Sequence, residues 1–144
     1  MSVPGPFLRM MIGAPAVPST SDHFVEILRE TMVSLVRRDG PDLTARQLSV
    51  FLTVYLCEGP HTVRALAATL RVSKPAITRG LDRLEEFDLA RRMIDPLDRR
   101  SVIVHRTDKG AALLRETSAI MLEAASASST IAKPQPTRRQ APSS

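Results

Sequence analysis

A predicted helix at residues 73–87 carries basic and polar side chains opposite an apolar side. At 100° per residue, Ile77, Leu81 and Leu84 fall close together on one side of this helix, so we expect them to be buried. The opposite side and the first turn offer groups that hydrogen-bond to phosphates and base edges. The candidate DNA-contacting residues of this helix are Ser73, Lys74, Pro75, Thr78, Arg79, Asp82 and Arg83.

These candidates suit different parts of a duplex. Arg79 can pair bidentately with guanine, and Thr78 can contact a thymine methyl group or a phosphate. Ser73 and the free N–H groups of the first turn form a phosphate site. Asp82 can accept from a cytosine amino group, but its position three residues after Arg79 favours holding that side chain. A merely solvated basic face is the alternative, which this helix alone does not exclude.

A predicted hairpin directly after this helix concentrates four arginines, in the run RRMIDPLDRRS of residues 91–101. We expect its strands at residues 89–95 and 101–106, with a turn at 96–99. A protruding arginine suits the narrow minor groove of DNA, whose negative potential attracts it. Asp98, two residues before Arg100, can brace both that side chain and the turn. The helix and the hairpin together favour contact with two grooves of one duplex.

The overall charge agrees with a polyanionic partner without requiring one. Lys and Arg number 20 against 15 acidic residues, which gives a net charge of +5 and a pI of about 10.3. Such an excess suits nucleic acid, but it is also typical of a basic protein that binds none. Aromatic residues make up only 3% of the chain, so the core must be aliphatic, and this composition favours helices.

No other residues have the spacing of a catalytic or metal site. The histidines are expected at a helix start, a loop and a strand, and they share no metal-ligand spacing; they are His23, His61 and His105. Glu85 and Glu86 are expected on a solvated helix face rather than in an acid–base pair. We therefore expect neither an enzyme nor a cofactor.

The single cysteine, Cys57, excludes an internal disulfide. It follows an apolar helix and precedes Glu58, so it is predicted to be a small buried hydrophobic residue rather than a redox sensor, which needs an exposed electropositive setting. No apolar run is long enough to span a membrane, and the N-terminus lacks the pattern of a secretory signal. We expect a cytoplasmic protein with no membrane partner.

The elements that position the basic residues form one mainly α domain with a small β-hairpin, an α+β arrangement, at residues 21–128. Capping residues predict the helix starts: Thr44 with Gln47, Thr62, Ser73 and Thr107. Helices are expected at about 22–38, from 44 toward Gly59-Pro60, and at 63–70, 73–87 and 108–128. Residues 1–20 are expected to be an irregular arm, and residues 129–144 a disordered basic tail.

Two details of the helices lead to further expectations. The apolar side of the second helix is predicted to consist of Leu48, Phe51, Leu52, Tyr55 and Leu56. Gly80 lies in the middle of the fourth helix, where glycine costs about 1 kcal/mol relative to alanine. We expect close packing on the second helix to explain it. The element order, four helices, a hairpin and a last helix, is that of a winged helix-turn-helix at residues 43–106.

Residues 73–110 resemble the MarR family of dimeric winged-helix regulators, in the run SKPAITRGLDRLEEFDLARRMIDPLDRRSVIVHRTDKG. The matching features are Leu84-Glu85, Asp95-Pro96, the stretch 98–101, and Thr107 followed three residues later by Gly110. A looser resemblance reaches back to Leu43, so about half of the chain is covered. The helix pattern or the Asp-Arg-Arg hairpin alone would be weak evidence for this resemblance, and the two together are fairly specific to the family.

The resemblance implies a homodimeric DNA-binding transcription regulator on a pseudo-palindromic site, with one helix of each subunit in successive major grooves. It implies Arg100, and with it Arg99, at the minor groove. It further implies a repressor that releases DNA when a small anionic or phenolic ligand binds between two lobes. The helices at 21–40 and 107–128 would pair between subunits through Phe24, Ile27, Leu28, Leu114, Ile120 and Met121.

The sequence departs from the family pattern at three places. Asp88 stands where the family usually has a glycine, and Arg106 stands where a buried leucine usually precedes Thr107. Arg106 could reach DNA or a partner, or the strand could be shifted by one residue. Only about 20 helical residues follow the hairpin, fewer than in many family members, so the dimer would depend on a shorter last helix. The alternative function is a winged-helix module that binds another protein and has no specific DNA site.

Overall fold

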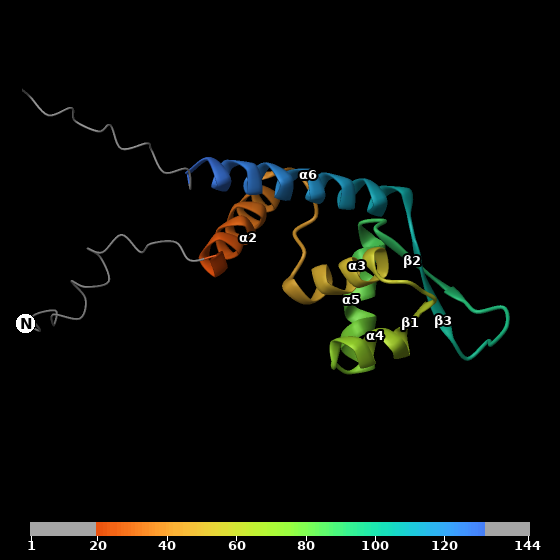
Figure 1. The fold of residues 1–144 in the computed structure, drawn as a ribbon. Helices are drawn as coiled ribbons and strands as arrows, with labels where there is room; N and C mark the ends of the chain where they lie inside the picture. The colour runs from red at the N-terminus through yellow and green to blue at the C-terminus, as the bar shows by residue number, and fades with distance from the viewer. Residues whose placement is uncertain (1–19, 132–144) are drawn as a thin grey trace, which may run out of the picture.

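The computed structural model describes residues 20–131, which form five helices and a small three-stranded sheet. The outer helices are α2 (Thr20–Arg37) and α6 (Asp108–Ile131). Between them in sequence come α3 (Ala45–Leu56), α4 (Val63–Leu70) and α5 (Lys74–Glu86). The strands are β1 (His61–Thr62), β2 (Ala90–Ile94) and β3 (Val102–Arg106). The mainly α winged helix-turn-helix expected from the sequence is confirmed (Figure 1).

The helices begin where the capping residues predict. Thr44 and Gln47 form a complete capping box, with Gln47 N donating to Thr44 Oγ1 (3.2 Å) and Thr44 N to Gln47 Oε1 (3.0 Å). The hydroxyls of Thr62, Ser73 and Thr107 accept from the backbone N–H three residues later. These contacts satisfy donors that a helix start leaves free, so they fix each start locally.

The sheet has three antiparallel strands in the order β1-β3-β2, one more strand than the sequence predicts. β2 and β3 pair from Ala90 opposite Arg106 to Ile94 opposite Val102. The short β1 places His61 opposite Val104 and so joins the start of α4 to the hairpin. Two residues are too few to show a strand periodicity, so only the pairing with the distant β3 defines this strand.

The core lies between α3, α4, α5 and the base of the hairpin. Its largest fully buried side chains are Val50, Phe51, Val54, Leu66, Ile77, Leu81, Leu84 and Leu89. Ile77, Leu81 and Leu84 are buried as expected. The prediction for α3 is wrong in part, because Val50 and Val54 are completely buried while Leu56 is 67% exposed. The buried side of α3 is therefore rotated from the predicted one, toward the residues that face α5.

Tyr55 and Gly110 connect this core to α6. Tyr55 Oη donates to the carbonyl oxygen of Leu89 (2.7 Å) and accepts from Thr107 N (2.9 Å). A Cβ atom on Gly110 would lie 1.7 Å from Tyr55 Oη and 2.5 Å from Leu89 O. Glycine is thus required at the start of α6 because the tyrosine hydroxyl occupies the space of a side chain.

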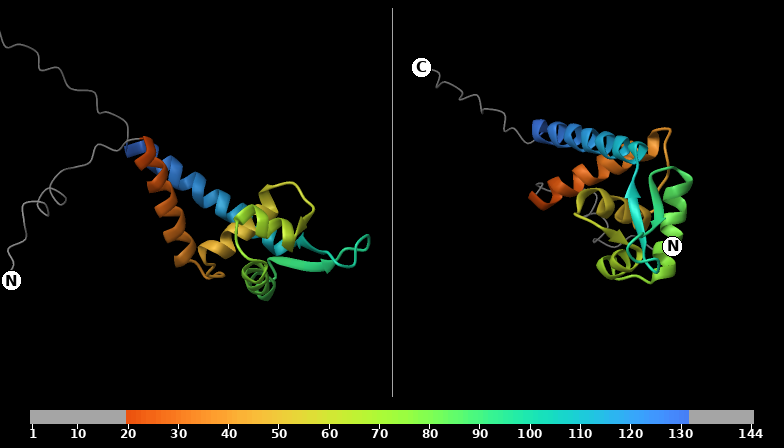
Figure 2. Two further views of the ribbon diagram at one scale, coloured as in Figure 1. Left: turned by 90° about the horizontal axis from the view of Figure 1, so that it is seen from below. Right: turned by 90° about the vertical axis from the view of Figure 1, so that its right-hand side faces the viewer.

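The outer helices α2 and α6 pack against each other in opposite directions. Near one end of the pair, His23 Nδ1 lies 2.6 Å from Ser128 Oγ. Near the other end, Arg38 Nη1 lies 2.7 Å from Glu116 Oε2, an ion pair whose geometry is not that of a hydrogen bond. The buried residues between the helices include Thr31 and Thr117. The free ends of the pair and the tip of the hairpin lie at opposite ends of the described chain (Figure 2).

Candidate nucleic-acid interface

The exposed side of α5 contains all seven residues predicted for DNA contact. Ser73, Lys74, Pro75, Thr78, Arg79, Asp82 and Arg83 are all exposed. The other side of the helix is buried through Ala76, Ile77, Gly80, Leu81 and Leu84. The Ser73 hydroxyl accepts from Ala76 N (3.3 Å), and Pro75 occupies the first turn, where its missing N–H costs nothing. The helix start is therefore fixed while its outer face stays open.

The basic residues of this face differ in their surroundings. Among residues 20–131, neither Lys74 nor Arg79 takes part in an ion pair. Arg83 instead pairs with Glu86 (2.6 Å), and its guanidinium carbon lies 4.5 Å from the centre of the Phe87 ring. Lys74 and Arg79 are thus the cations of this helix that keep their charge available for a ligand.

Asp82 contacts the hairpin rather than Arg79. Arg92 Nη2 donates to Asp82 Oδ1 (2.5 Å) and to Glu85 Oε2 (2.7 Å), and Arg92 N donates to Glu85 Oε1 (2.6 Å). The expectation that Asp82 holds Arg79 is therefore wrong. Glu85 is also not on a solvated face, because it is partly buried beside Arg92. This cluster ties β2 to α5 and fixes the position of the hairpin relative to the helix.

The same cluster shifts two pKa values. The hydrogen bond from the Arg92 guanidinium lowers the pKa of Glu85, and this effect exceeds the opposite one of partial burial. The hydrogen bond to Glu85 likewise raises the pKa of Arg92, with Asp82 contributing in the same direction. Both groups are therefore charged at neutral pH, and the guanidinium of Arg92 is held by carboxylates of α5 instead of being presented to a ligand.

Two aspartates shape the tip of the hairpin. Asp95 Oδ1 accepts from Leu97 N (2.9 Å), and Asp98 Oδ1 accepts from Arg100 N (3.1 Å). Asp95 N and Ser101 N close the turn with backbone hydrogen bonds of 2.9 Å each. Asp98 thus braces the turn as predicted, but it contacts the backbone of Arg100 and not its guanidinium. Arg99 and Arg100 are both exposed.

Arg106 caps the end of α3. Its Nε donates to the carbonyl oxygen of Val54 (2.8 Å), and its Nη2 donates to that of Cys57 (3.0 Å). Carbonyl groups at a helix C-terminus lack partners within the helix and favour a positive charge. The open question about Arg106 is therefore answered by a structural role within the chain, which the sequence did not suggest because the two ends lie about 50 residues apart.

One further departure from the family pattern, at Asp88, has a local explanation, and the predictions for Cys57 and Gly80 need correction. Asp88 has a φ of 56°, in the left-handed region that favours glycine and tolerates Asp, so the family's glycine position keeps its backbone conformation here. Cys57 is exposed, so the prediction that it is buried is wrong. Gly80 faces Val50, but an added Cβ would lie 3.9 Å from Val50 Cγ2, an ordinary contact. Close packing therefore does not explain this glycine.

The predicted dimerisation residues fall into three groups. Phe24, Leu28 and Met121 are exposed, and Leu114 and Ile120 are half-buried. Ile27 is only 8% exposed, and it lies on α2, which packs against α6 of its own chain. Ile27 therefore contributes to the helix pair within one subunit, and the exposed residues are the ones open to a second subunit.

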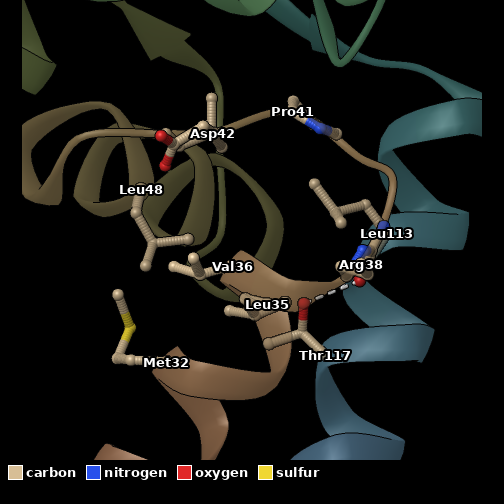
Figure 3. A pocket seen from close by; sticks show the side chains of 10 residues that line it. Met32, Leu35, Val36, Arg38, Pro41, Asp42, Leu48, Leu113 and Thr117 are labelled. Atoms are coloured by element: carbon tan, nitrogen blue, oxygen red, sulfur yellow. Dashed lines mark hydrogen bonds between the residues drawn. The ribbon is translucent and has the colours of Figure 1, made fainter.

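A small pocket lies where α2, α3 and α6 meet (Figure 3). Met32, Leu35 and Leu48 are among its apolar walls, and Arg38 and Asp42 are its charged residues. Its volume of about 40 Å³ is room for little more than a water molecule.

Within residues 20–131 no group of three or more His, Cys, Asp or Glu side chains is arranged to hold a metal ion, and no helix is long and apolar enough to cross a membrane.

Three helices followed by a hairpin, with an exposed basic helix beside a basic hairpin tip, define the winged helix-turn-helix class. Residues 43–102 match the family model described as the MarR family, so this part of the chain is similar to that family. The HTH-type transcriptional regulator MgrA of Staphylococcus aureus is 34% identical over 88 residues, which cover 61% of this chain and 59% of MgrA. The chain thus matches less than two thirds of the length of this transcriptional regulator.

Solved structures support the same fold. The structure of YusO from Bacillus subtilis is 26% identical, with a TM-score of 0.55, over 75% of this chain and 71% of YusO. A mutant of S. aureus MepR bound to an oligodeoxyribonucleotide has a TM-score of 0.61 at 18% identity, over 90% of this chain and 82% of MepR. At that low identity the likeness to MepR concerns the fold alone.

Proposed function

We propose that this protein is a sequence-specific regulator of transcription that binds double-stranded DNA through α5 and the β2–β3 hairpin. The observation that carries the proposal is the division of α5, whose buried side holds the core while its seven candidate residues are exposed. Arg79 would read a base edge in the major groove, and Ser73 and Lys74 would contact phosphates. A MepR mutant of the same fold is bound to an oligodeoxyribonucleotide, which supports this assignment.

The hairpin would supply the second contact. Arg99 and Arg100 lie in a turn that two aspartate side chains and two backbone hydrogen bonds hold. A preformed turn loses little conformational entropy when its arginines enter a minor groove. The cluster of Asp82, Glu85 and Arg92 would set the spacing between this turn and α5.

We further propose a homodimer that acts in the cytoplasm as a repressor on a pseudo-palindromic operator. Its two copies of α5 would enter major grooves about 34 Å apart, one turn of the duplex. Exposed apolar residues on α2 and α6, such as Phe24, Leu28 and Met121, support pairing between subunits. Binding of an anionic or phenolic ligand stays a prediction. The pocket beside Arg38 has a volume of about 40 Å³, far smaller than that of known ligand sites. Ligand binding there would therefore require α2 to move away from α3.

Two substitutions test the assigned roles, with gel shifts on duplexes from the upstream region of the protein's own gene. Arg79→Ala should lose about 1–3 kcal/mol of affinity and tolerate changes at one base pair, because a bidentate contact to guanine is removed. Arg100→Ala should weaken binding to all sequences more evenly. Unchanged affinity in both variants would contradict the proposed interface. Failure of the unaltered protein to bind any duplex would favour the alternative, a module that binds another protein.

A further inference from the structure

A groove of about 510 Å³ lies between the start of α3 and the first half of α5. One wall is formed by residues 44–47, and the other by Ala76, Arg79 and Gly80. The small side chains of Ala45, Ala76 and Gly80 leave the groove open, so a chain of another molecule has room to lie in it. Arg79 is a proposed DNA contact, and the groove continues from it toward α3.

The groove is positively charged. Arg46 and Arg79 are both exposed, and among residues 20–131 neither takes part in an ion pair. No carboxylate lines the groove, whereas the groove at the base of the hairpin includes Asp88 and Asp108 besides its basic residues. Two unpaired guanidinium groups without a neighbouring acid favour an anion, and arginine matches the planar oxygens of a phosphate.

The stability of α3 does not explain Arg46. This residue lies in the first turn of α3, where a positive charge opposes the helix dipole and an acidic residue would be more favourable. The start of the helix is instead fixed by the capping box, in which the side chains of Thr44 and Gln47 each accept a hydrogen bond from the other residue's backbone N–H. Within residues 20–131 the guanidinium of Arg46 makes neither an ion pair nor a hydrogen bond, and its charge does not favour the start of α3.

We propose that Arg46 binds a backbone phosphate of the DNA, and that this phosphate lies in the groove between α3 and Arg79. The proposal rests on the function proposed above, since the phosphate belongs to the duplex that α5 reads. Arg46 supplies no base contact, so it adds affinity that is independent of sequence. The contact from Arg46 also fixes the tilt of α5 relative to the duplex, because it holds the DNA strand beside this helix.

The experiment compares Arg46→Gln with Arg115→Gln, a matched loss of one positive charge from the exposed face of α6. Fluorescence anisotropy gives the affinity for an upstream duplex, and for a shuffled duplex, at several salt concentrations. Because the proposed dimer carries two copies of Arg46, Arg46→Gln should reduce the slope of log affinity against log salt by about 1.8, about 0.9 for each phosphate contact. Its affinity should therefore fall about 12-fold less than that of the unaltered protein between 50 and 200 mM salt. Arg115→Gln should keep the slope, and Arg46→Lys should restore most of it.

The possible results separate the two proposals. If the unaltered protein binds the duplex and Arg46→Gln has the slope of Arg115→Gln, the phosphate site is wrong while the proposed function stands. If Arg46→Gln changes the preference between the upstream and shuffled duplexes, Arg46 contacts a base, which also overturns the phosphate assignment. If the unaltered protein binds no duplex, the proposed function fails and the phosphate site fails with it. Circular dichroism and the unfolding temperature of both variants confirm that the fold is kept.

Discussion

Two glycines inside helices illustrate how a single residue depends on its surroundings. Gly110 in α6 lies against Tyr55 Oη, where a Cβ atom would be only 1.7 Å away. A Cβ atom on Gly80 in α5 would lie 3.9 Å from its nearest neighbour, Val50 Cγ2. Both are buried and neither has a positive φ. The same substitution should therefore have opposite effects at the two positions.

Gly110→Ala should lower the free energy of unfolding by about 1–3 kcal/mol, because the added methyl group must displace Tyr55 or the backbone at Leu89. Gly80→Ala should raise it by about 1 kcal/mol, the usual gain in helix propensity. Urea unfolding of the two variants and the unaltered protein measures both changes. A destabilised Gly80→Ala variant would show that α3 and α5 are packed more tightly than this contact distance indicates.

Single-residue features were predictable from the sequence where their cause is local. The capping residues Thr44, Thr62, Ser73 and Thr107 were all predicted, because each bonds to a backbone group three residues away. The partners of Asp82 and Arg106 were not predictable. Those partners are Arg92 and the end of α3, which only the folded chain brings close.

At the scale of elements, the cluster of Asp82, Glu85 and Arg92 joins the hairpin to α5. Glu85 bonds both the backbone N and the guanidinium of Arg92, so it holds the strand as well as the side chain. The order of the helices was predictable from caps and apolar spacing, but α6 continues to Ile131, past the predicted end at residue 128 and into the segment predicted to be disordered. The strand β1 was not predictable, and the true buried side of α3 was shifted, because packing against α5 and β3 decides both.

The lowered pKa of Glu85 makes this connection sensitive to acid. A carboxylate whose pKa is lower in the folded state stabilises the fold above its ordinary pKa of 4.5, and this stabilisation is lost as the pH falls through the lowered value. Between pH 6 and pH 3, the unaltered protein should therefore lose about 1 kcal/mol more stability than Glu85→Gln, a modest figure because the pair is partly solvated.

Urea unfolding at both pH values measures this difference. Glu86→Gln is the matched control, because Glu86 follows on the same helix and its pair with Arg83 is more exposed, with side-chain exposures of 60% and 47%. The control should lose stability in acid as the unaltered protein does. Equal acid sensitivity in the unaltered protein and in Glu85→Gln would contradict the role assigned to the cluster.

At the scale of the whole molecule, the helix pair and the hairpin lie at opposite ends, which separates proposed pairing from proposed DNA contact (Figure 2). The outer helices expose Phe24, Val25, Leu28, Met121 and Leu122. Apolar side chains gathered on two packed helices favour a protein partner, and a second copy is the proposed one. The sequence could not decide which residues face that copy, since Ile27 has the same apolar character but is buried within the chain.

Leu28→Arg should shift the protein from a dimer of twice 15.8 kDa toward a monomer of 15.8 kDa, because a charge would be placed in the apolar contact. Light scattering after size-exclusion chromatography measures the mass. Leu56→Arg is the control, since Leu56 is an equally apolar exposed residue outside the outer helices, and it should stay dimeric. An unaltered protein that is monomeric at micromolar concentration would contradict the proposed dimer.

The affinity of the unaltered protein for duplex DNA tests the central claim most directly. Fluorescence anisotropy at ~50 mM salt, where phosphate contacts are strong, would compare a duplex from the upstream region with a shuffled duplex of the same composition. We predict binding to the upstream duplex at least about 10³-fold tighter than to the shuffled one, as base contacts from α5 require. Equal affinities, or no binding to either duplex, would contradict a winged helix-turn-helix that reads sequence.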